Sequence, residues 1–252
     1  MRESNWDKQI IQNFDAAANN YNTEADIQKE VALKLATVCS IHSIPPGIWV
    51  DLASGTGLLA ECLERLNPNQ SIIRLDKSIS MLDQQPREKI KQIWDLNKGL
   101  PEWDKSPTLF SSSFGLHWLR NPPNRLKEWR NALSPEGWIA LAVPVEGSFS
   151  EWHEAAQKAN VPCTATPLPT SKSLFDVVKE NQIHHEELYQ IKQVAPTATS
   201  LFKPMIKVGA KTSPKPSLSI GEWRKLTSNW PLSSINKSLT LTWSIQLLLI
   251  KK

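Results

Sequence analysis

The residues best suited to bind a polar ligand lie in one short stretch, "VDLASGTG" at positions 50–57. An apolar run precedes it and the amphipathic run "LLAECLERL" follows it, so we expect a turn that leads from a strand into a helix. Backbone N–H groups at the start of a helix, together with the helix dipole, attract electron-rich ligand atoms. Gly55 and Gly57 permit the positive φ angles and the close ligand approach that such a turn requires.

Two more carboxylates follow the next apolar runs. Asp76 ends "IIRLD", about 20 residues beyond the glycines, and Asp95 ends "KQIWD". The carboxyl ends of parallel strands meet at one edge of a sheet, where a carboxylate in the position of Asp76 accepts hydrogen bonds from ribose hydroxyls. Asp51, Asp76 and Asp95 therefore predict a nucleoside-binding edge.

The loop lacks the features of two common phosphate-binding motifs. It has no lysine of the GxxxxGKS type, and it lacks the GxGxxG spacing of dinucleotide sites. A ligand with a ribose but no pyrophosphate fits better, which indicates S-adenosylmethionine as the cofactor. Ala53 stands where a third glycine is usual, and it is compatible with the loop if its φ angle is negative.

Strand-like and helix-like runs alternate as far as Pro144. Further strands are expected at "PTLFSSS" and "WIALAVP", with the helix "NRLKEWRNAL" between them. This alternation predicts an α/β protein with a mostly parallel, doubly wound sheet that helices cover on both faces.

The regular alternation of strand-like and helix-like runs ends at Pro144. We expect helices at 146–159 and 173–181, a strand at "HEELYQIKQV", a helix interrupted by Pro204 and a buried terminal strand at "SLTLTWSIQLLLI". We predict a single domain spanning residues 1–252, with an N-terminal arm at 1–23 and a partial lid or insertion at 161–235.

Composition excludes several other classes of protein. The 252 residues carry a formal charge of +4, and no basic block with interleaved aromatics predicts a nucleic-acid site. No apolar run is long enough to span a bilayer, so we expect no membrane partner. Cys39, Cys62 and Cys163 are widely spaced, which indicates reduced thiols and no metal site. We expect a cytoplasmic monomer.

Longer motifs carry a resemblance to known families. "VDLASGTG" followed by "LDKSISML" resembles the class I S-adenosylmethionine-dependent methyltransferases. "FDAAANNYN", "SSFGLHW", "VEGSFSEWHEA" and the terminal "LTLTWSIQLLLIKK" are similar to the malonyl-(acyl-carrier protein) O-methyltransferases of biotin synthesis. The resemblance extends over nearly the whole chain. It implies a Rossmann-like sheet with an antiparallel C-terminal strand and a small helical lid.

The same resemblance implies roles for particular residues. Tyr21 would close over cofactor and substrate, and His117 and Trp118 would lie beside the reacting centre. The cofactor would contact residues of the arm, the loop and three strand ends, namely Tyr21, Asp51, Ala53, Ser54, Gly55, Gly57, Asp76, Lys77, Ser78, Met81, Asp95, Leu96 and Ser112.

The implied reaction transfers a methyl group to the free carboxylate of a malonyl thioester on an acyl-carrier protein. A carboxylate with a pKa of about 4 is ionised at neutral pH, so the reaction requires alignment and exclusion of water rather than a general base. A cation should hold this carboxylate. Arg224 is the only arginine after Arg130, which leaves Lys203, Lys207 and Lys211 as substrate-binding candidates. The lysines of 203–215 are a solvated face or a docking surface for the acidic carrier protein.

Two other functions stay open from the sequence. One is a small-molecule carboxyl or quinone-type methyltransferase of the same fold. The other is a catalytically idle methyltransferase fold that acts as a binding subunit, which Ala53 favours and the three aspartates oppose.

Overall fold

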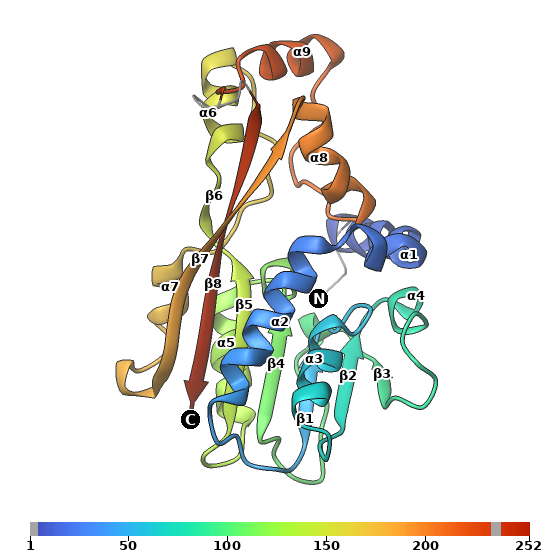
Figure 1. Ribbon diagram of the computed structural model, residues 1–252, viewed down its shortest axis with the longest axis vertical. Helices are drawn as coiled ribbons and strands as arrows, with labels where there is room; N and C mark the ends of the chain where they lie inside the picture. Colours follow the sequence, from blue (N-terminus) through green and yellow to red (C-terminus); the bar gives the residue numbers. More distant parts are fainter. Residues whose placement is uncertain (1–4, 233–237) are drawn as a thin grey trace.

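A seven-stranded sheet forms the centre of the protein, in a computed structural model that describes residues 5–232 and 238–252 (Figure 1). The strand order is β3-β2-β1-β4-β5-β8-β7, and the pairs among β1 to β5 are parallel. β8 runs antiparallel to both β5 and β7. The predicted α/β class, with an antiparallel C-terminal strand, is confirmed. The strands are β1 (Trp49–Leu52), β2 (Ile72–Asp76), β3 (Lys91–Ile93), β4 (Leu109–Ser113), β5 (Trp138–Pro144), β7 (Ile183–Ala195) and β8 (Leu239–Lys251).

Helices cover both faces of the parallel strands, which explains why β1 and β5 are buried throughout and, except for Asp51, apolar. One face packs against two helices near the N-terminus, and the other packs against two helices from the middle of the chain. The first pair is α2 (Asp26–Ser40) and α3 (Leu58–Leu66), and the second is α5 (Pro122–Ala132) and α7 (Ser171–Phe175).

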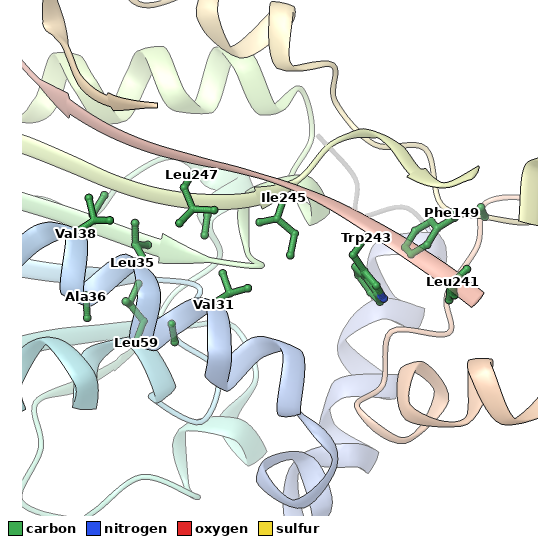
Figure 2. Packing of buried hydrophobic residues seen from close by; sticks show 14 of the residues in the cluster. Val31, Leu35, Ala36, Val38, Leu59, Phe149, Leu241, Trp243, Ile245 and Leu247 are labelled. Atoms are coloured by element: carbon green, nitrogen blue, oxygen red, sulfur yellow. The ribbon is translucent and has the colours of Figure 1, made fainter. Parts of the chain in front are cut away.

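The C-terminal strand β8 connects the two ends of the molecule. Its inward residues Ile245 and Leu247 pack on the side of Val31 and Leu35 from α2, and Trp243 continues the same row toward Phe149 (Figure 2). Both β7 and β8 are 13 residues long and extend beyond the parallel strands (Figure 1). Their extended ends carry a second group of helices.

We call this second group the upper lobe; it consists of α6 (Ser150–Ala159), α8 (Ala198–Lys207) and α9 (Ile220–Ser228) (Figure 1). Aromatic rings in mutual contact form its interior, which accounts for several of the 11 tryptophans. The rings belong to Phe149, Trp152, Phe202, Trp223, Trp230 and Trp243. Part of the predicted 161–235 insertion lies elsewhere, because β7 is an edge strand of the main sheet.

The arm expected at 1–23 forms a 20-residue helix, α1 (Asn5–Glu24), over the residues that the structure describes. Its side chains reach both the main sheet and the upper lobe. Thr56 donates a hydrogen bond to Asn22 over 2.6 Å, and Asn13 donates one to Thr212 over 2.7 Å. α1 therefore spans the space between the carboxyl edge of the sheet and the upper lobe (Figure 1).

Three local predictions differ from the structure. The helix expected at 146–159 begins only at Ser150, because Phe149 adopts a left-handed φ of 62° and the preceding residues form the short strand β6 (Glu146–Phe149). The helix expected at 173–181 ends at Phe175. Pro204 does not interrupt its helix but lies inside α8.

Candidate active site

The turn between β1 and α3 adopts the backbone that its glycines predict. Gly55 has a φ of 55° and Gly57, which precedes α3, has a φ of 88°. The N–H of Ser54 donates to the carbonyl of Leu75 on β2, which fixes the turn against the neighbouring strand. The loop thus presents the N-terminus of α3 to the carboxyl edge of the sheet.

The prediction of a negative φ angle at Ala53 is wrong, because its φ is +55°. A left-handed residue with a Cβ is strained by about 1–2 kcal/mol. Gly115 leaves the space that the methyl group needs, since a Cβ on Gly115 would lie 2.6 Å from the Cβ of Ala53. The loop therefore keeps the shape of a glycine-containing loop at the expense of local strain.

Asp51 lies beneath this loop and is almost completely buried, with 1% exposure. Its two oxygens accept hydrogen bonds from the hydroxyls of Ser111 and Ser54, each over 2.8 Å. Burial raises the pKa of Asp51 to about 6, although the two serines oppose the shift. The carboxylate is therefore mostly ionised at pH 7, in a fixed orientation.

Asp76 connects the glycine loop to the end of β2. Its two carboxylate oxygens accept from the backbone N–H groups of Gly55 and Ser78, each over 2.8 Å. Burial raises the pKa of Asp76. Ser78 caps α4 (Ile79–Leu82) as predicted, accepting from the N–H of Met81 over 3.1 Å.

Asp95 lies two residues beyond the end of β3, at the start of a short 3-10 helix. One oxygen accepts from the N–H of Asn97 over 3.0 Å, and the other pairs with Lys77 at 3.0 Å. The three aspartates thus lie at successive strand ends along one hollow, as the sequence predicts.

We call this hollow the cofactor cavity. Gly57 and Ser112, both predicted to bind the cofactor, do not line it. Ser112 is buried and donates to the carbonyl of Leu52 over 2.8 Å, whereas the hydroxyl of Ser113 lines the cavity and has no hydrogen-bond partner among the described residues. The other predicted cofactor residues line it: Tyr21, Asp51, Ala53, Ser54, Gly55, Asp76, Lys77, Ser78, Met81, Asp95 and Leu96.

α1 supplies part of the cavity wall, of which only Tyr21 was predicted from the sequence. Asp7, Ile10, Phe14 and Tyr21 lie on one side of the helix and line the cofactor cavity. Their spacing of three, four and seven residues is typical of one helix face and was the available signal. Asp7 is buried and forms an ion pair with Arg120.

A second hollow of about 570 Å³ lies next to the first; we call it the acceptor cavity. Its size is that of a small-molecule site. The two cavities share five lining residues, which form the boundary between them: Phe14, Tyr21, Gln28, Phe114 and Trp118. Most of the remaining wall of the acceptor cavity comes from the loop segments 164–168 and 208–218 and from five aromatic side chains of the upper-lobe interior: Phe149, Trp152, Phe202, Trp223 and Trp243.

The three residues predicted at the reacting centre lie at or near this boundary. Tyr21 and Trp118 line both cavities, and burial together with Asp76 raises the pKa of the Tyr21 phenol. His117 lines the acceptor cavity and is 8% exposed. Burial lowers its pKa to about 3, so the imidazole is neutral at pH 7 and a poor general base.

Only one of the three predicted substrate-binding lysines lines the acceptor cavity. This residue is Lys211, whereas Lys207 pairs with Glu24 of α1 and Lys203 is exposed on α8. The cavity contains a further lysine that the sequence did not single out. Lys215 lines it and donates to the carbonyl of Cys163 over 2.7 Å.

The described parts of the chain offer no candidate for a metal site or for a membrane-spanning helix. Residues 5–232 and 238–252 contain no group of three or more histidine, cysteine, aspartate or glutamate side chains placed to hold a metal ion. Within the same ranges, no helix has the length and apolarity needed to cross a membrane.

Comparison with protein families supports the class of protein that this geometry defines. Residues 50–141 match the family described as "Methyltransferase domain". The fold is shared with the YcgJ protein from Bacillus subtilis, with a TM-score of 0.60 and 13% identity over 88% of this chain and 98% of that one. A putative methyltransferase from Bacillus halodurans also has a TM-score of 0.60, with 13% identity over 86% and 98%. The chain is an S-adenosylmethionine-dependent methyltransferase that carries this domain over residues 50–141.

Three relatives of known name indicate a narrower group of methyltransferases to which the chain is similar. The chain is 24% identical over 263 residues to the malonyl-(acyl-carrier protein) O-methyltransferase of Marinomonas sp. strain MWYL1, covering 98% of this chain and 94% of the relative. The enzyme of that name from Pectobacterium atrosepticum is 26% identical over 83% and 82%. The one from Dechloromonas aromatica is 32% identical, but the match spans only 58% of this chain and 54% of the relative.

The strain at Ala53 predicts a stabilising substitution. Ala53→Gly should raise the free energy of unfolding by about 0.5–1 kcal/mol, because relief of the left-handed strain exceeds the added chain entropy. Urea denaturation followed by circular dichroism measures the change. Ala60→Gly, within the buried part of α3, is the matched control and should lower stability by about 1 kcal/mol. A loss of stability in both variants would contradict the strain at Ala53.

Proposed function

We propose that this enzyme transfers a methyl group to the free carboxylate of malonyl-(acyl-carrier protein), an early step of biotin synthesis. The observation that carries the proposal is the shared wall of the two cavities, with three ordered carboxylates on one side and lysines on the other. S-adenosylmethionine supplies the electrophilic methyl group when it is bound. Similarity to malonyl-(acyl-carrier protein) O-methyltransferases over nearly the whole chain supports the acceptor.

The cofactor cavity offers groups that fit the two ends of this cofactor. Both oxygens of Asp76 accept backbone hydrogen bonds, and the carboxylate retains lone-pair capacity for a ribose hydroxyl. Asp51, ionised and buried below the loop, would meet the ammonium of the methionine end. The backbone of Leu96 and the side chain of Asp95 would face the adenine.

The acceptor cavity supplies positioning rather than acid–base chemistry. An acceptor carboxylate needs no base, which agrees with the neutral state of His117. Aromatic walls exclude water from the reacting oxygen, while Tyr21 and Trp118 would orient it toward the cofactor cavity. Lys211 and Lys215 are the cations that line this cavity in the described chain, and they would hold the anionic acceptor.

A second acceptor class is supported by one observation. The acceptor cavity is lined by aromatic rings, including Phe114, Trp152 and Trp243. Such walls also suit a flat quinol, which belongs to the small-molecule alternative. A catalytically idle subunit is less consistent with the ordered state of Asp51 and Asp76.

Methyl transfer to defined acceptors tests the proposal. Purified enzyme and S-adenosylmethionine should form a methyl ester on malonyl-(acyl-carrier protein), detected by the mass of the intact carrier protein. Free malonate and a quinol precursor are the comparison acceptors, and we expect little product from either. The gene should also restore growth of a biotin-requiring strain that lacks its malonyl methyltransferase. Product on the quinol alone would identify the second acceptor class.

The lysines of the acceptor cavity predict a separate effect on acceptor affinity. Lys215→Ala and Lys211→Ala should each raise the KM for the acceptor about ten-fold with kcat nearly unchanged, because each removes a charged hydrogen bond worth about 1.5 kcal/mol. Steady-state kinetics at fixed cofactor concentration gives both constants. Lys203→Ala, an exposed lysine outside both cavities, is the control and should leave them unchanged. An equal effect of all three variants would point to general surface charge instead.

A further inference from the structure

A row of polar side chains crosses the sheet directly below the glycine loop. In the strand register, Ser111 pairs with Asp51, Asp51 with Arg74, and Arg74 with Lys91. Register partners in neighbouring parallel strands point to the same face of a sheet. Asp51 and Arg74 are 1% and 0% exposed, so two buried side chains of opposite charge leave adjacent positions on the same face of the sheet.

Arg74 has more hydrogen-bonding capacity than its ion pair uses. One terminal nitrogen donates to Glu64 on α3 over 2.8 Å, while Nε and the other terminal nitrogen are buried and have no acceptor among the described residues. A buried donor without an acceptor destabilises the folded state. Lys89 contacts the same oxygen of Glu64 at 2.7 Å from a more exposed position. Glu64 would therefore have a cationic partner without Arg74.

The charge of Arg74 acts on Asp51. Burial raises the pKa of this carboxyl group, and the charge of Asp76 raises it further. The hydroxyls of Ser54 and Ser111 lower it, and Arg74 is the positive charge that lowers it. Because the resulting pKa is about 6, removal of one nearby charge would change the ionisation of Asp51 near neutral pH.

We propose that Arg74 is a positioning residue for the cofactor, because its buried guanidinium keeps Asp51 ionised and ready to bind the cofactor's ammonium. The proposal rests on the contact proposed above between Asp51 and that ammonium. Arg74 itself does not line the cofactor cavity and acts through Asp51. The positive charge that acts on Asp51 thus comes from a residue below the edge of the sheet and not from a residue that lines the cofactor cavity.

The pH dependence of cofactor binding tests this role. S-adenosylhomocysteine, which carries the same ammonium, is titrated calorimetrically into the protein between pH 5 and 7.5. For the unaltered protein, affinity should fall as pH decreases through about 6, where Asp51 gains a proton. In Arg74→Met the pH midpoint of this loss of affinity should rise by about one unit, which makes binding about five-fold weaker at pH 6. Arg74→Lys should restore most of the original profile.

Two controls separate the electrostatic role from a structural one. Lys89→Met removes a cation from the same Glu64 without changing the row beside Asp51, so its midpoint should stay at the original pH. The double variant Arg74→Met with Glu64→Gln removes the whole ion pair and should keep the displaced midpoint. Near-ultraviolet circular dichroism confirms that each variant is folded. An unchanged midpoint in folded Arg74→Met, or in the double variant, would overturn the proposal.

The variant Asp51→Asn tests separately whether Asp51 contacts the cofactor's ammonium, on which the proposal for Arg74 rests. If Asp51 binds the ammonium, this variant should bind more weakly and lose the decline below pH 6. A flat profile in Asp51→Asn together with an unchanged midpoint in Arg74→Met would reject Arg74 alone. Unaltered binding by Asp51→Asn would reject the contact and, with it, the role of Arg74.

Discussion

The site depends on one carboxylate that joins two turns. Asp76 accepts the N–H of Gly55 from the first turn and the N–H of Ser78 from the second, each over 2.8 Å. These bonds hold the N-terminus of α3 and the end of β2 in a fixed relation. The carboxylate is half-buried, which strengthens each bond and removes freedom from the loop. The cofactor cavity is thus preorganised by interactions within the chain.

A second constraint is the position of α1 between the sheet and the upper lobe. Its face bearing Phe14 and Tyr21 contributes to both cavities, so the same helix covers the cofactor cavity and bounds the acceptor cavity. Hydrogen bonds from Thr56 to Asn22 and from Asn13 to Thr212 attach α1 to each part of the protein. α1 therefore links the glycine loop of the cofactor cavity to the loop that follows α8.

The sequence predicted the sheet and the three aspartates well because both follow from local rules. Apolar runs of strand length predict the strands, and parallel strands bring Asp51, Asp76 and Asp95 to one edge. Ser78 was identified as a helix cap for the same reason. These features depend on residues that are neighbours in the chain or on the general geometry of a wound sheet.

The errors lie where distant segments decide the conformation. Ala53 is left-handed because Gly115, 62 positions later, leaves room for it, and no local pattern reveals that match. The serine that lines the cavity is Ser113 rather than Ser112, since strand alternation fixes the facing side only once pairing is known. Lys215 lies in an irregular proline-rich loop, whose course depends on packing against the upper lobe.

Calorimetric titration of S-adenosylhomocysteine into the protein and into Asp76→Ala tests the central claim most directly. The account predicts micromolar binding by the unaltered protein and a loss of about 1–3 kcal/mol in Asp76→Ala, because charged hydrogen bonds to the ribose and to the loop are removed. Asp83→Ala, at an exposed position after α4, should bind like the unaltered protein. Absence of binding by the unaltered protein, or equal affinity in Asp76→Ala, would contradict the account.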